Sequence, residues 1–467
     1  MNGHTPLEVV SPYTGAVIGT VARSGAAEVE QALTESFAIF RNRDRWLPVH
    51  QRVDVLTRLA GLMEDRLEEL ARLAASEGGK PLIDSRVEAA RAADGVRLAV
   101  ETIRSEAGHT IPIAGTAAGA KRLAFTQKEP VGVVVAVSAF NHPLNLIVHQ
   151  VAAAVAAGCS VIVKPAEDTP LSAFRFVELM AQAGLPEGWC RFLIPTDLEL
   201  AEALVTDSRV GFFSFIGSAK IGWMLRSRLA PGTRCALEHG GAAPLIVAGD
   251  ADLDLAVPAI LKGGFYHAGQ VCVSVQRVFA HHSIAEELAN RLAAGASELT
   301  VGDPLDERTD VGPLIRPAEL ERVSIWVDDA TQAGARRVSG GEDLGHNCYA
   351  PTVLVDPPAD ARVSREEIFG PVVCVYPFDD LDHAIERAND LPVAFQAAVF
   401  TRSVDTALRV YRRIDASAVM VNDHTAFRVD GMPFAGLRQS GYGVGGIPYT
   451  IEDMQIEKMA VIHSPEL

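Results

Sequence analysis

The sequence predicts an α/β protein built on a doubly wound parallel sheet, followed by a second α/β unit. Two observations support this fold class. From Pro130 onward, short apolar strands alternate with helical segments, and the order of strand, crossover helix and strand recurs several times. The chain also has 467 residues, 48% of them hydrophobic, which is too long for one compact core. We therefore expect two or three domains.

The opening segment, 26–106, favours helices. Apolar residues over 53–79 recur at helical spacing, and a Gly-Gly pair followed by Pro81 ends this helix. A second helix is expected over 86–108. Residues 110–120 are rich in Gly, Ala and Thr, so we expect a loop or an extended arm there.

The alternating segment supplies the first sheet. Its strands are short and apolar, as parallel strands covered by helices on both faces should be. Ligands of such sheets bind at the carboxyl ends of the strands, so a nucleotide is expected there. Strands are expected at 131–137, 160–166, 190–195 and 210–217, and helices at 146–158, 172–184, 198–205 and 218–229.

A second α/β unit begins near Gly240 and continues to about Phe434. The tail, 448–464, alternates apolar and polar residues as an edge strand does. Strands of the second unit are expected at 243–250, 350–356 and 372–378.

The charge and the apolar runs exclude several classes of partner. The chain carries 42 Lys and Arg against 59 Asp and Glu, a net charge of −17, which repels nucleic-acid phosphate and anionic membranes. The apolar run 130–140 is too short to span a bilayer and is expected to be a buried strand. The N-terminal MNGHTPLEVV lacks the basic and apolar regions of a secretory signal. We expect a cytoplasmic protein with neither nucleic-acid nor membrane partners.

The cysteines do not indicate a metal site. They form no CxxC pair, and none lies near a His at zinc-binding spacing, so no metal is expected. Scattered cysteines in a long cytosolic chain are mostly small buried residues. The six are Cys159, Cys190, Cys235, Cys272, Cys348 and Cys374.

Cys272 stands apart because it lies where a Gly-containing turn leads into an apolar strand. Backbone N–H groups of such a turn can stabilise a thiolate, which is the reactive form of cysteine. Glu238, at the end of the last strand of the first unit, is a candidate base for the same chemistry. Core packing is the alternative interpretation of Cys272.

Two motifs are candidates for holding a nucleotide, although no GxGxxG follows the first strand. Residues 217–222, GSAKIG, open a helix whose backbone N–H groups, with Ser218, could hold a phosphate; they are also an ordinary helix start. Lys164 and Glu167 follow the second strand, where an acidic side chain can accept both ribose hydroxyls. The alternative is a surface Lys and a helix-start Glu before Pro170.

Taken together, the motifs resemble the aldehyde dehydrogenase superfamily over essentially the whole chain, and come nearest to its phosphonoacetaldehyde dehydrogenase-like subset. The separation of Glu238 and Cys272 also matches the family. Two departures are His239, where the common motif is ELGG, and Phe140, where Trp is common. The matching segments are SPYTG at 11–15, FNHPLN at 140–145, VIVKPAEDTP at 161–170, FIGSAKIG at 215–222, LEHGGAAP at 237–244, GQVC at 269–272, EEIFGP at 366–371 and PFAGLRQSG at 433–441.

The resemblance implies a catalytic role for three residues. Cys272 would attack the aldehyde carbonyl, and Asn141 with the backbone N–H of Cys272 would hold the oxyanion. Hydride would pass to a nicotinamide cofactor, and Glu238 would activate the water that hydrolyses the resulting thioester. The presence of Glu238 favours the free acid over transfer to coenzyme A, and the full catalytic set argues against a non-catalytic scaffold.

The resemblance also implies the cofactor. Glu167 favours NAD, with NADP as the alternative, because an acidic group there repels a 2′-phosphate. The family binds its dinucleotide without GxGxxG. The implied cofactor-binding residues are Phe140, Lys164, Glu167, Gly217, Ser218, Gly240, Glu367 and Phe369.

A small anionic aldehyde is the implied substrate. In the subset named above, residues at the positions of Arg91, His142 and Arg428 grip a phosphonate, phosphate, sulfonate or carboxylate tail. An Arg before the nucleophile is also typical there, but this chain has Val271. The alternatives are a salt-bridged helix residue for Arg91 and a capping residue for His142, with an uncharged short or hydroxy-aldehyde as substrate.

The resemblance further implies the domain organisation. An NAD-binding domain would span 1–109 and 132–240, and a catalytic domain would span 241–437. A β arm made of 110–131 and 453–467, joined by a return segment at 438–452, would cross to a neighbouring subunit. We therefore expect a homodimer or homotetramer.

Overall fold

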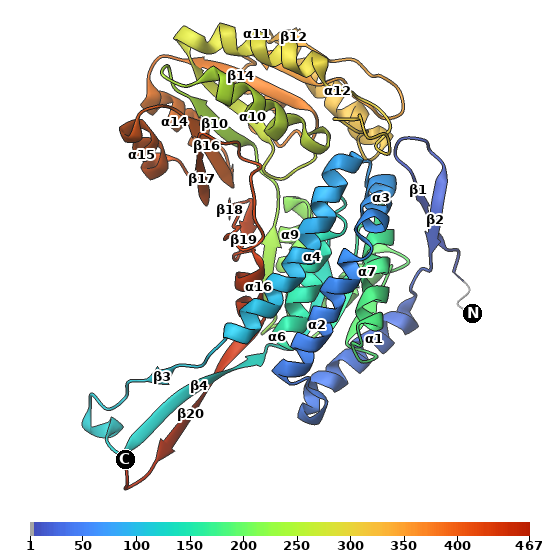
Figure 1. Ribbon diagram of the computed structural model, residues 1–467, viewed down its shortest axis with the longest axis vertical. Coiled ribbons are helices and arrows are strands. Elements are labelled where there is room, and N and C mark those ends of the chain that lie inside the picture. The colour runs from blue at the N-terminus through green and yellow to red at the C-terminus, as the bar shows by residue number, and fades with distance from the viewer. Residues whose placement is uncertain (1–3) are drawn as a thin grey trace.

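The structure is a computed structural model that describes residues 4–467, and it contains two α/β units and a projecting arm (Figure 1). The first unit has a six-stranded sheet of order β19-β9-β8-β5-β6-β7. Strands β5 to β9 run parallel, and β19 is antiparallel to β9. The bounds are β5 (Val133–Val137), β6 (Val161–Lys164), β7 (Cys190–Phe192), β8 (Val210–Ile216), β9 (Arg234–Glu238) and β19 (Gly441–Tyr442).

This order creates a switch point between β5 and β8. The chain proceeds from β5 through β6 and β7 to one side of the sheet and then returns to build β8 and β9 on the other. Connections therefore leave β5 and β8 in opposite directions and open a crevice beyond their carboxyl ends, where dinucleotides bind in such sheets.

Helices cover both faces of the first sheet. Alternate residues of β5 enter different cores: Val134 and Ala136 pack into one, Val133 and Val135 into the other. The helices are α1 (Ala26–Arg41), η1 (Arg43–Arg45), α2 (Val49–Glu64), α3 (Leu67–Gly78), α4 (Leu82–Ser105), α5 (Asn145–Ile147), η3 (Val148–Ala152), α6 (Ala153–Ala157), α7 (Pro170–Gln182), α8 (Leu198–Thr206), α9 (Ala219–Arg226) and α16 (Ile447–Asp453).

The second unit has a seven-stranded sheet of order β12-β13-β14-β11-β10-β16-β17, parallel except for β12. The strands are β10 (Ala243–Val247), β11 (Val275–His281), β12 (Arg336–Ser339), β13 (Thr352–Val355), β14 (Val372–Phe378), β16 (Gln396–Phe400) and β17 (Ala418–Val421). The helices are α10 (Leu253–Phe265), η4 (Tyr266–Gly269), α11 (His282–Glu298), α12 (Pro317–Gln332), α13 (Arg362–Arg365), α14 (Leu381–Asn389) and α15 (Val404–Arg413).

A three-stranded sheet of order β20-β4-β3 extends away from both units (Figure 1). The long antiparallel pair β4–β20 runs from Gln455 opposite Pro130 to His463 opposite Arg122. Two small antiparallel pairs, β1–β2 and β15–β18, complete the strands. The bounds are β3 (Thr110–Ile111), η2 (Ala117–Gly119), β4 (Arg122–Pro130), β20 (Gln455–His463), β1 (Leu7–Val10), β2 (Val17–Val21), β15 (Val393–Ala394) and β18 (Leu437–Arg438).

The α/β class is confirmed, but three expected elements were wrong in part. The helix expected over 53–79 is two helices, α2 and α3, which are separated at residues 65–66. The tail 448–464 is not all strand, because α16 takes its first half: Ile447, Ile451 and Met454 recur at helical spacing and are buried in the core of the first unit. The helix expected at 146–158 is interrupted by the π-helical turn η3, in which one residue is added to the usual repeat.

The described residues contain neither a candidate membrane-spanning helix nor a candidate metal-binding group. Across 4–467, no helix is long and apolar enough to cross a membrane. Within the same residues, no group of three or more His, Cys, Asp or Glu side chains is arranged to hold a metal ion.

Candidate active site

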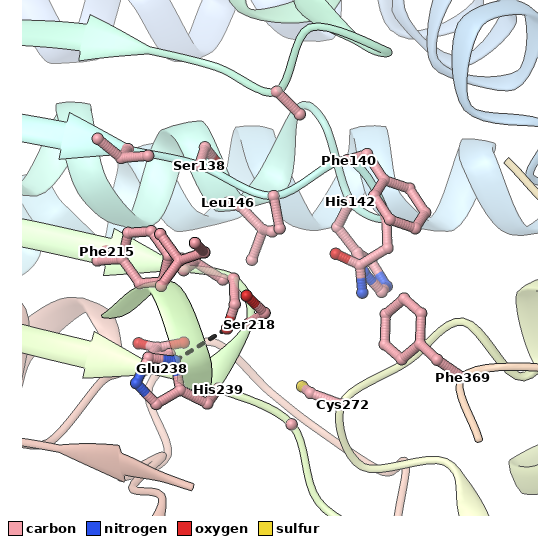
Figure 2. Close-up of a pocket in the computed structure, with 18 of the residues that line it drawn as sticks. Ser138, Phe140, His142, Leu146, Phe215, Ser218, Glu238, His239, Cys272 and Phe369 are labelled. Carbon is pink, nitrogen blue, oxygen red and sulfur yellow. Dashed lines mark hydrogen bonds between the residues drawn. The ribbon is translucent and has the colours of Figure 1, made fainter. Parts of the chain in front are cut away.

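A cavity of about 560 Å³ lies at the switch point, between the first sheet and the loops of the second unit. Figure 2 shows Cys272 and Glu238 on one side of it, and Phe140 and His142 on the opposite side. Every candidate residue from the sequence except Glu167 lines this cavity: Arg91, Phe140, Asn141, His142, Lys164, Gly217, Ser218, Glu238, Gly240, Cys272, Glu367, Phe369 and Arg428.

Cys272 sits in a tightly braced loop between η4 and β11. The backbone before it turns through positive φ at His267, Ala268 and Gly269. The buried side chain of Gln270 braces this turn, because its amide donates to the His267 carbonyl (3.2 Å) and accepts from the Ile315 N–H (3.0 Å). These contacts fix the backbone turn that leads to Cys272.

The electrostatic surroundings keep the Cys272 thiol protonated. Burial raises its pKa to about 12, while the charge of Arg428 acts in the opposite direction. A neighbouring group must therefore remove the proton as the sulfur attacks. Burial also raises the pKa of Glu238, with Arg428 again opposing, so its carboxylate is a stronger base than an exposed one.

The close fit around Glu238 fixes this carboxylate. Glu238 ends β9, and an added Cβ at Gly445 would lie 2.1 Å from its Oε1. Only a glycine backbone leaves room for the carboxylate there. The carboxylate therefore lies against the backbone of Gly445 while Glu238 also lines the cavity.

Asn141 is buried and oriented by one hydrogen bond. Its Nδ2 donates to the backbone carbonyl of Gln270 at 2.9 Å, which leaves a second amide hydrogen for a ligand oxygen. The loop after Asn141 is fixed by Glu88, which accepts the N–H groups of Leu144 and Asn145 at 3.0 Å each. A buried ion pair with Lys80 holds Glu88 in turn.

The nucleotide side of the cavity has features that suit a dinucleotide. Ser218 is the N-cap of α9, so free backbone N–H groups face the crevice. Lys164 ends β6 and donates to the Pro165 carbonyl at 3.2 Å, which leaves two ammonium hydrogens. His239 braces the turn before Ser218 through a hydrogen bond between Nδ1 and the Gly217 carbonyl (2.8 Å).

Glu367 and two rings complete the far wall. Burial raises the pKa of Glu367 to about 8, and its carboxylate accepts the Gly241 N–H at 3.3 Å. A Cβ at Gly240 would lie 1.9 Å from that carboxylate, so this position requires glycine. Phe140 and Phe369 meet edge to face, with ring centroids 5.8 Å apart.

Glu167 is not among the residues that line the cavity. Arg23 donates to its Oε2 at 3.2 Å, and the two form an ion pair that is partly exposed. The carboxylate that was expected at the ribose is thus engaged by a residue 144 positions earlier in the chain.

The two arginines expected at the substrate differ in their partners. Arg91 forms two hydrogen bonds with Asp430, at 2.7 and 3.1 Å, so its charge is already compensated. Arg428 forms no ion pair with any described residue; its guanidinium lies over the ring of Phe434, 3.6 Å from the centroid. Its Nε has no hydrogen-bond partner in the described structure.

His142 is a neutral member of this wall. Its Nε2 is 3.2 Å from the hydroxyl of Tyr266, and burial lowers its pKa well below the ordinary value. Near neutral pH it can offer a hydrogen bond but no charge. Val271, where an arginine would add charge, is buried among apolar side chains that include Val273 and Phe434.

Comparison with known proteins identifies the family. A model of the aldehyde dehydrogenase family matches residues 1–460. The chain belongs to this family. It is therefore an oxidoreductase of the NAD(P)-dependent aldehyde dehydrogenase type, and its fold is that of an aldehyde dehydrogenase.

Three similar proteins are informative. A 3-sulfolactaldehyde dehydrogenase of Priestia aryabhattai is 38% identical over 98% of this chain and 95% of its own. An aldehyde dehydrogenase of Physcomitrella patens, solved with the reaction product succinate, superposes with a TM-score of 0.95 at 33% identity, over 99% of this chain and 96% of that one. A glyceraldehyde-3-phosphate dehydrogenase of Methanocaldococcus jannaschii, complexed with NADP, superposes with a TM-score of 0.93 at 32% identity. The match covers 99% of this chain and 100% of that one.

Three residues near the cavity were missed from the sequence. His149 and Asp430 form a buried hydrogen-bonded pair beneath Arg428, and Phe434 supplies the ring under its guanidinium. Phe434 lies inside the PFAGLRQSG motif and could have been noted there. His149 and Asp430 are 281 residues apart, and no local pattern connects them.

Proposed function

We propose that this aldehyde dehydrogenase oxidises a short aldehyde with an anionic tail to the corresponding acid. The observation that carries the proposal is Arg428, a half-buried cation that forms no ion pair with a described residue, in the same cavity as Cys272 and Glu238. A cation that is partly withdrawn from water and lacks an ion-pair partner favours binding of an anionic ligand. Carboxylate, sulfonate, phosphonate and phosphate tails all fit this requirement.

The cofactor is proposed to be NAD, with NADP as the alternative. The residues fit a dinucleotide: the α9 N-terminus and Ser218 would hold the pyrophosphate, Lys164 a ribose, and Glu367 with Phe369 the nicotinamide riboside. The missing Cβ at Gly240 leaves the close backbone approach that this arrangement requires. When bound, NAD supplies the acceptor for the hydride that leaves the substrate carbon.

The chemical steps follow from the positions of three groups. The Cys272 sulfur bonds to the aldehyde carbon, its proton passes to solvent water directly or through Glu238, which is left ionised, and the oxyanion accepts hydrogen bonds from Asn141 and the Cys272 N–H. Loss of hydride converts this adduct to a thioester. Glu238 then takes a proton from water, the hydroxyl attacks the thioester carbon, and the carbon–sulfur bond breaks to release the acid.

The similar proteins support an anionic tail. Their names concern 3-sulfolactaldehyde, succinate and glyceraldehyde 3-phosphate, each of which carries an anionic group. Because Arg91 is already paired with Asp430, we propose that Arg428 makes the ionic contact and that His142 contributes a hydrogen bond. In this arrangement, Arg428 supplies positive charge that an arginine at the position of Val271 would otherwise add.

A matched pair of four-carbon substrates tests the proposal. Succinate semialdehyde and butanal differ in the terminal carboxylate, and formation of the reduced cofactor measures both. The wild-type enzyme should prefer the semialdehyde, and Arg428→Met should lower kcat/KM for it about tenfold or more while butanal changes less than about twofold. Cys272→Ser should abolish both activities. Equal use of both aldehydes by the wild-type enzyme would instead favour an uncharged substrate.

A product assay separates hydrolysis from acyl transfer. With Glu238 as the water-activating base, the free acid should accumulate, and added coenzyme A should not change the rate or the product. An acyl-coenzyme A product would assign the chain to the acylating branch of the chemistry.

We also propose that the arm formed by β4 and β20 joins copies of this chain. The strands extend from the body and expose apolar side chains, including Met459 and Val461, that a monomer leaves in water. In this proposal the first unit binds the dinucleotide and the second supplies the nucleophile.

A further inference from the structure

A buried polar pair lies directly behind Arg428. His149 is 3% exposed in its π-helical turn, and its Nε2 is 2.7 Å from Oδ1 of Asp430. Its other ring nitrogen, Nδ1, is 3.4 Å from Nη2 of Arg428. The imidazole therefore bridges a carboxylate and the guanidinium that faces the cavity.

The two partners determine the tautomer of His149. A guanidinium can only donate, so Nδ1 must be the acceptor and carry no proton. The proton must then be on Nε2, where the Asp430 carboxylate accepts it. Burial, together with the nearby charge of Arg428, lowers the pKa of His149 to about 4, so the ring is neutral near neutral pH and this tautomer persists.

Asp430 is held in place by hydrogen bonds from several side chains. In addition to His149 it accepts from Arg91 and from Nδ2 of Asn145 (3.1 Å). The His149 hydrogen bond and the Arg91 charge outweigh burial and lower the pKa of Asp430, so it stays ionised. It forms an ion pair with Arg91, whereas Arg428 forms no ion pair with a described residue.

Contacts on two sides confine the guanidinium. Phe434 lies under its plane, and His149 accepts from one Nη nitrogen. Nε is buried without a partner, and no described residue accepts a hydrogen bond from Nη1, in a side chain that lines the cavity. Without the His149 contact, Arg428 could rotate about its long side chain and would lose entropy on binding an anion.

We propose that His149, held by Asp430, is a positioning residue that sets the orientation of Arg428 and thereby the preference for an anionic tail. The inference rests on the proposed function, since it assumes that Arg428 meets the tail. It assigns the specificity of the site to a hydrogen-bonded chain from Asp430 through His149 to Arg428. His149 itself touches neither the substrate nor the reacting atoms.

The test compares His149→Leu with His149→Gln. Leucine fills the space but offers no acceptor, whereas the glutamine amide can donate to Asp430 and accept from Arg428. His149→Leu should raise KM for succinate semialdehyde about five- to tenfold with kcat changed less than about twofold, and butanal kinetics should be unchanged. His149→Gln should restore most of the preference. Thermal unfolding of each variant checks the fold, and His149→Asn, too short to bridge both partners, replaces the Leu variant if that protein does not fold.

The outcomes separate the two proposals. A wild-type enzyme that does not distinguish succinate semialdehyde from butanal defeats the proposed function. Suppose that the wild-type enzyme prefers succinate semialdehyde to butanal and that Arg428→Met loses this preference. If His149→Leu then keeps the full preference, the positioning role of His149 is wrong, whereas the proposed function stands. An equal loss with both aldehydes in His149→Leu would also overturn it, because that pattern indicates a purely structural effect.

Discussion

At the scale of single residues, burial sets the chemistry of the cavity. The pKa values of Cys272, Glu238 and Glu367 are all raised because each ionised form lacks water, and Arg428 partly compensates the first two. Carboxylates with raised pKa values are better proton acceptors, and this suits a group that must activate water.

The base can be separated from the nucleophile kinetically. Glu238→Gln should allow the first hydride transfer and then stall at the thioester, giving a burst of reduced cofactor in stopped-flow measurements. The steady-state rate should fall about 10²- to 10⁴-fold, the usual contribution of a general base. Because the raised pKa of Glu238 leaves more of it protonated at low pH, wild-type kcat should rise as pH increases through that pKa. Steady turnover in Glu238→Gln at the wild-type rate would remove Glu238 from this role.

A glycine offers a second test at the same scale. Gly240→Ala should raise KM for the cofactor because its Cβ would displace the Glu367 carboxylate, 1.9 Å away. Gly61→Ala is the matched control, since nothing lies within 4 Å of its added Cβ in α2, and it should stabilise the helix by up to about 1 kcal/mol. If Gly240→Ala leaves KM for the cofactor unchanged, the Glu367 carboxylate can move aside without weakening cofactor binding. Cofactor titrations and thermal unfolding measure both effects.

At the scale of elements, local patterns predicted the framework and long-range contacts decided the details. The end of β9 at Glu238 was predicted, whereas β6 ends at Lys164, two residues before the expected end of that strand. The direction of the Glu167 side chain was not, because it depends on Arg23 from a segment far away in the chain. The helix in the first half of the tail, α16, was not predicted. The apolar residues there were interpreted as the alternating positions of a strand, whereas they recur at helical spacing.

The Arg23–Glu167 pair should influence cofactor choice. While Glu167 is engaged by Arg23, it neither accepts the ribose hydroxyls nor fully opposes a 2′-phosphate, so NADP should be tolerated. Arg23→Gln should free the carboxylate and shift the ratio of kcat/KM values toward NAD by about tenfold, whereas Glu167→Gln should shift it toward NADP. The ratio measured with both cofactors and one aldehyde is the readout. A shift toward NADP in Arg23→Gln would contradict this account.

At the scale of the whole molecule, the site depends on how two units face each other. The first sheet supplies Asn141 and Glu238 and the second unit supplies Cys272, so neither unit contains the complete cavity. The sequence and its family resemblance indicated which residues belong together. They could not show that Asp430 compensates Arg91, because a charge partner is set by the three-dimensional packing of distant segments.

The arm provides the prediction for the assembly. On β20, Met459 and Val461 are about half exposed, at 53% and 51%, while the strand is fully paired with β4 in its own chain. Charges at these positions should therefore spare the fold and disrupt only contacts between copies. Met459→Glu with Val461→Glu should convert the oligomer to a smaller species in light scattering, with far-UV circular dichroism unchanged. His463→Gln, a polar change at the end of the same strand, should leave the mass unaltered. If the double variant keeps the wild-type mass, β20 is not part of the contact and the arm must serve another purpose.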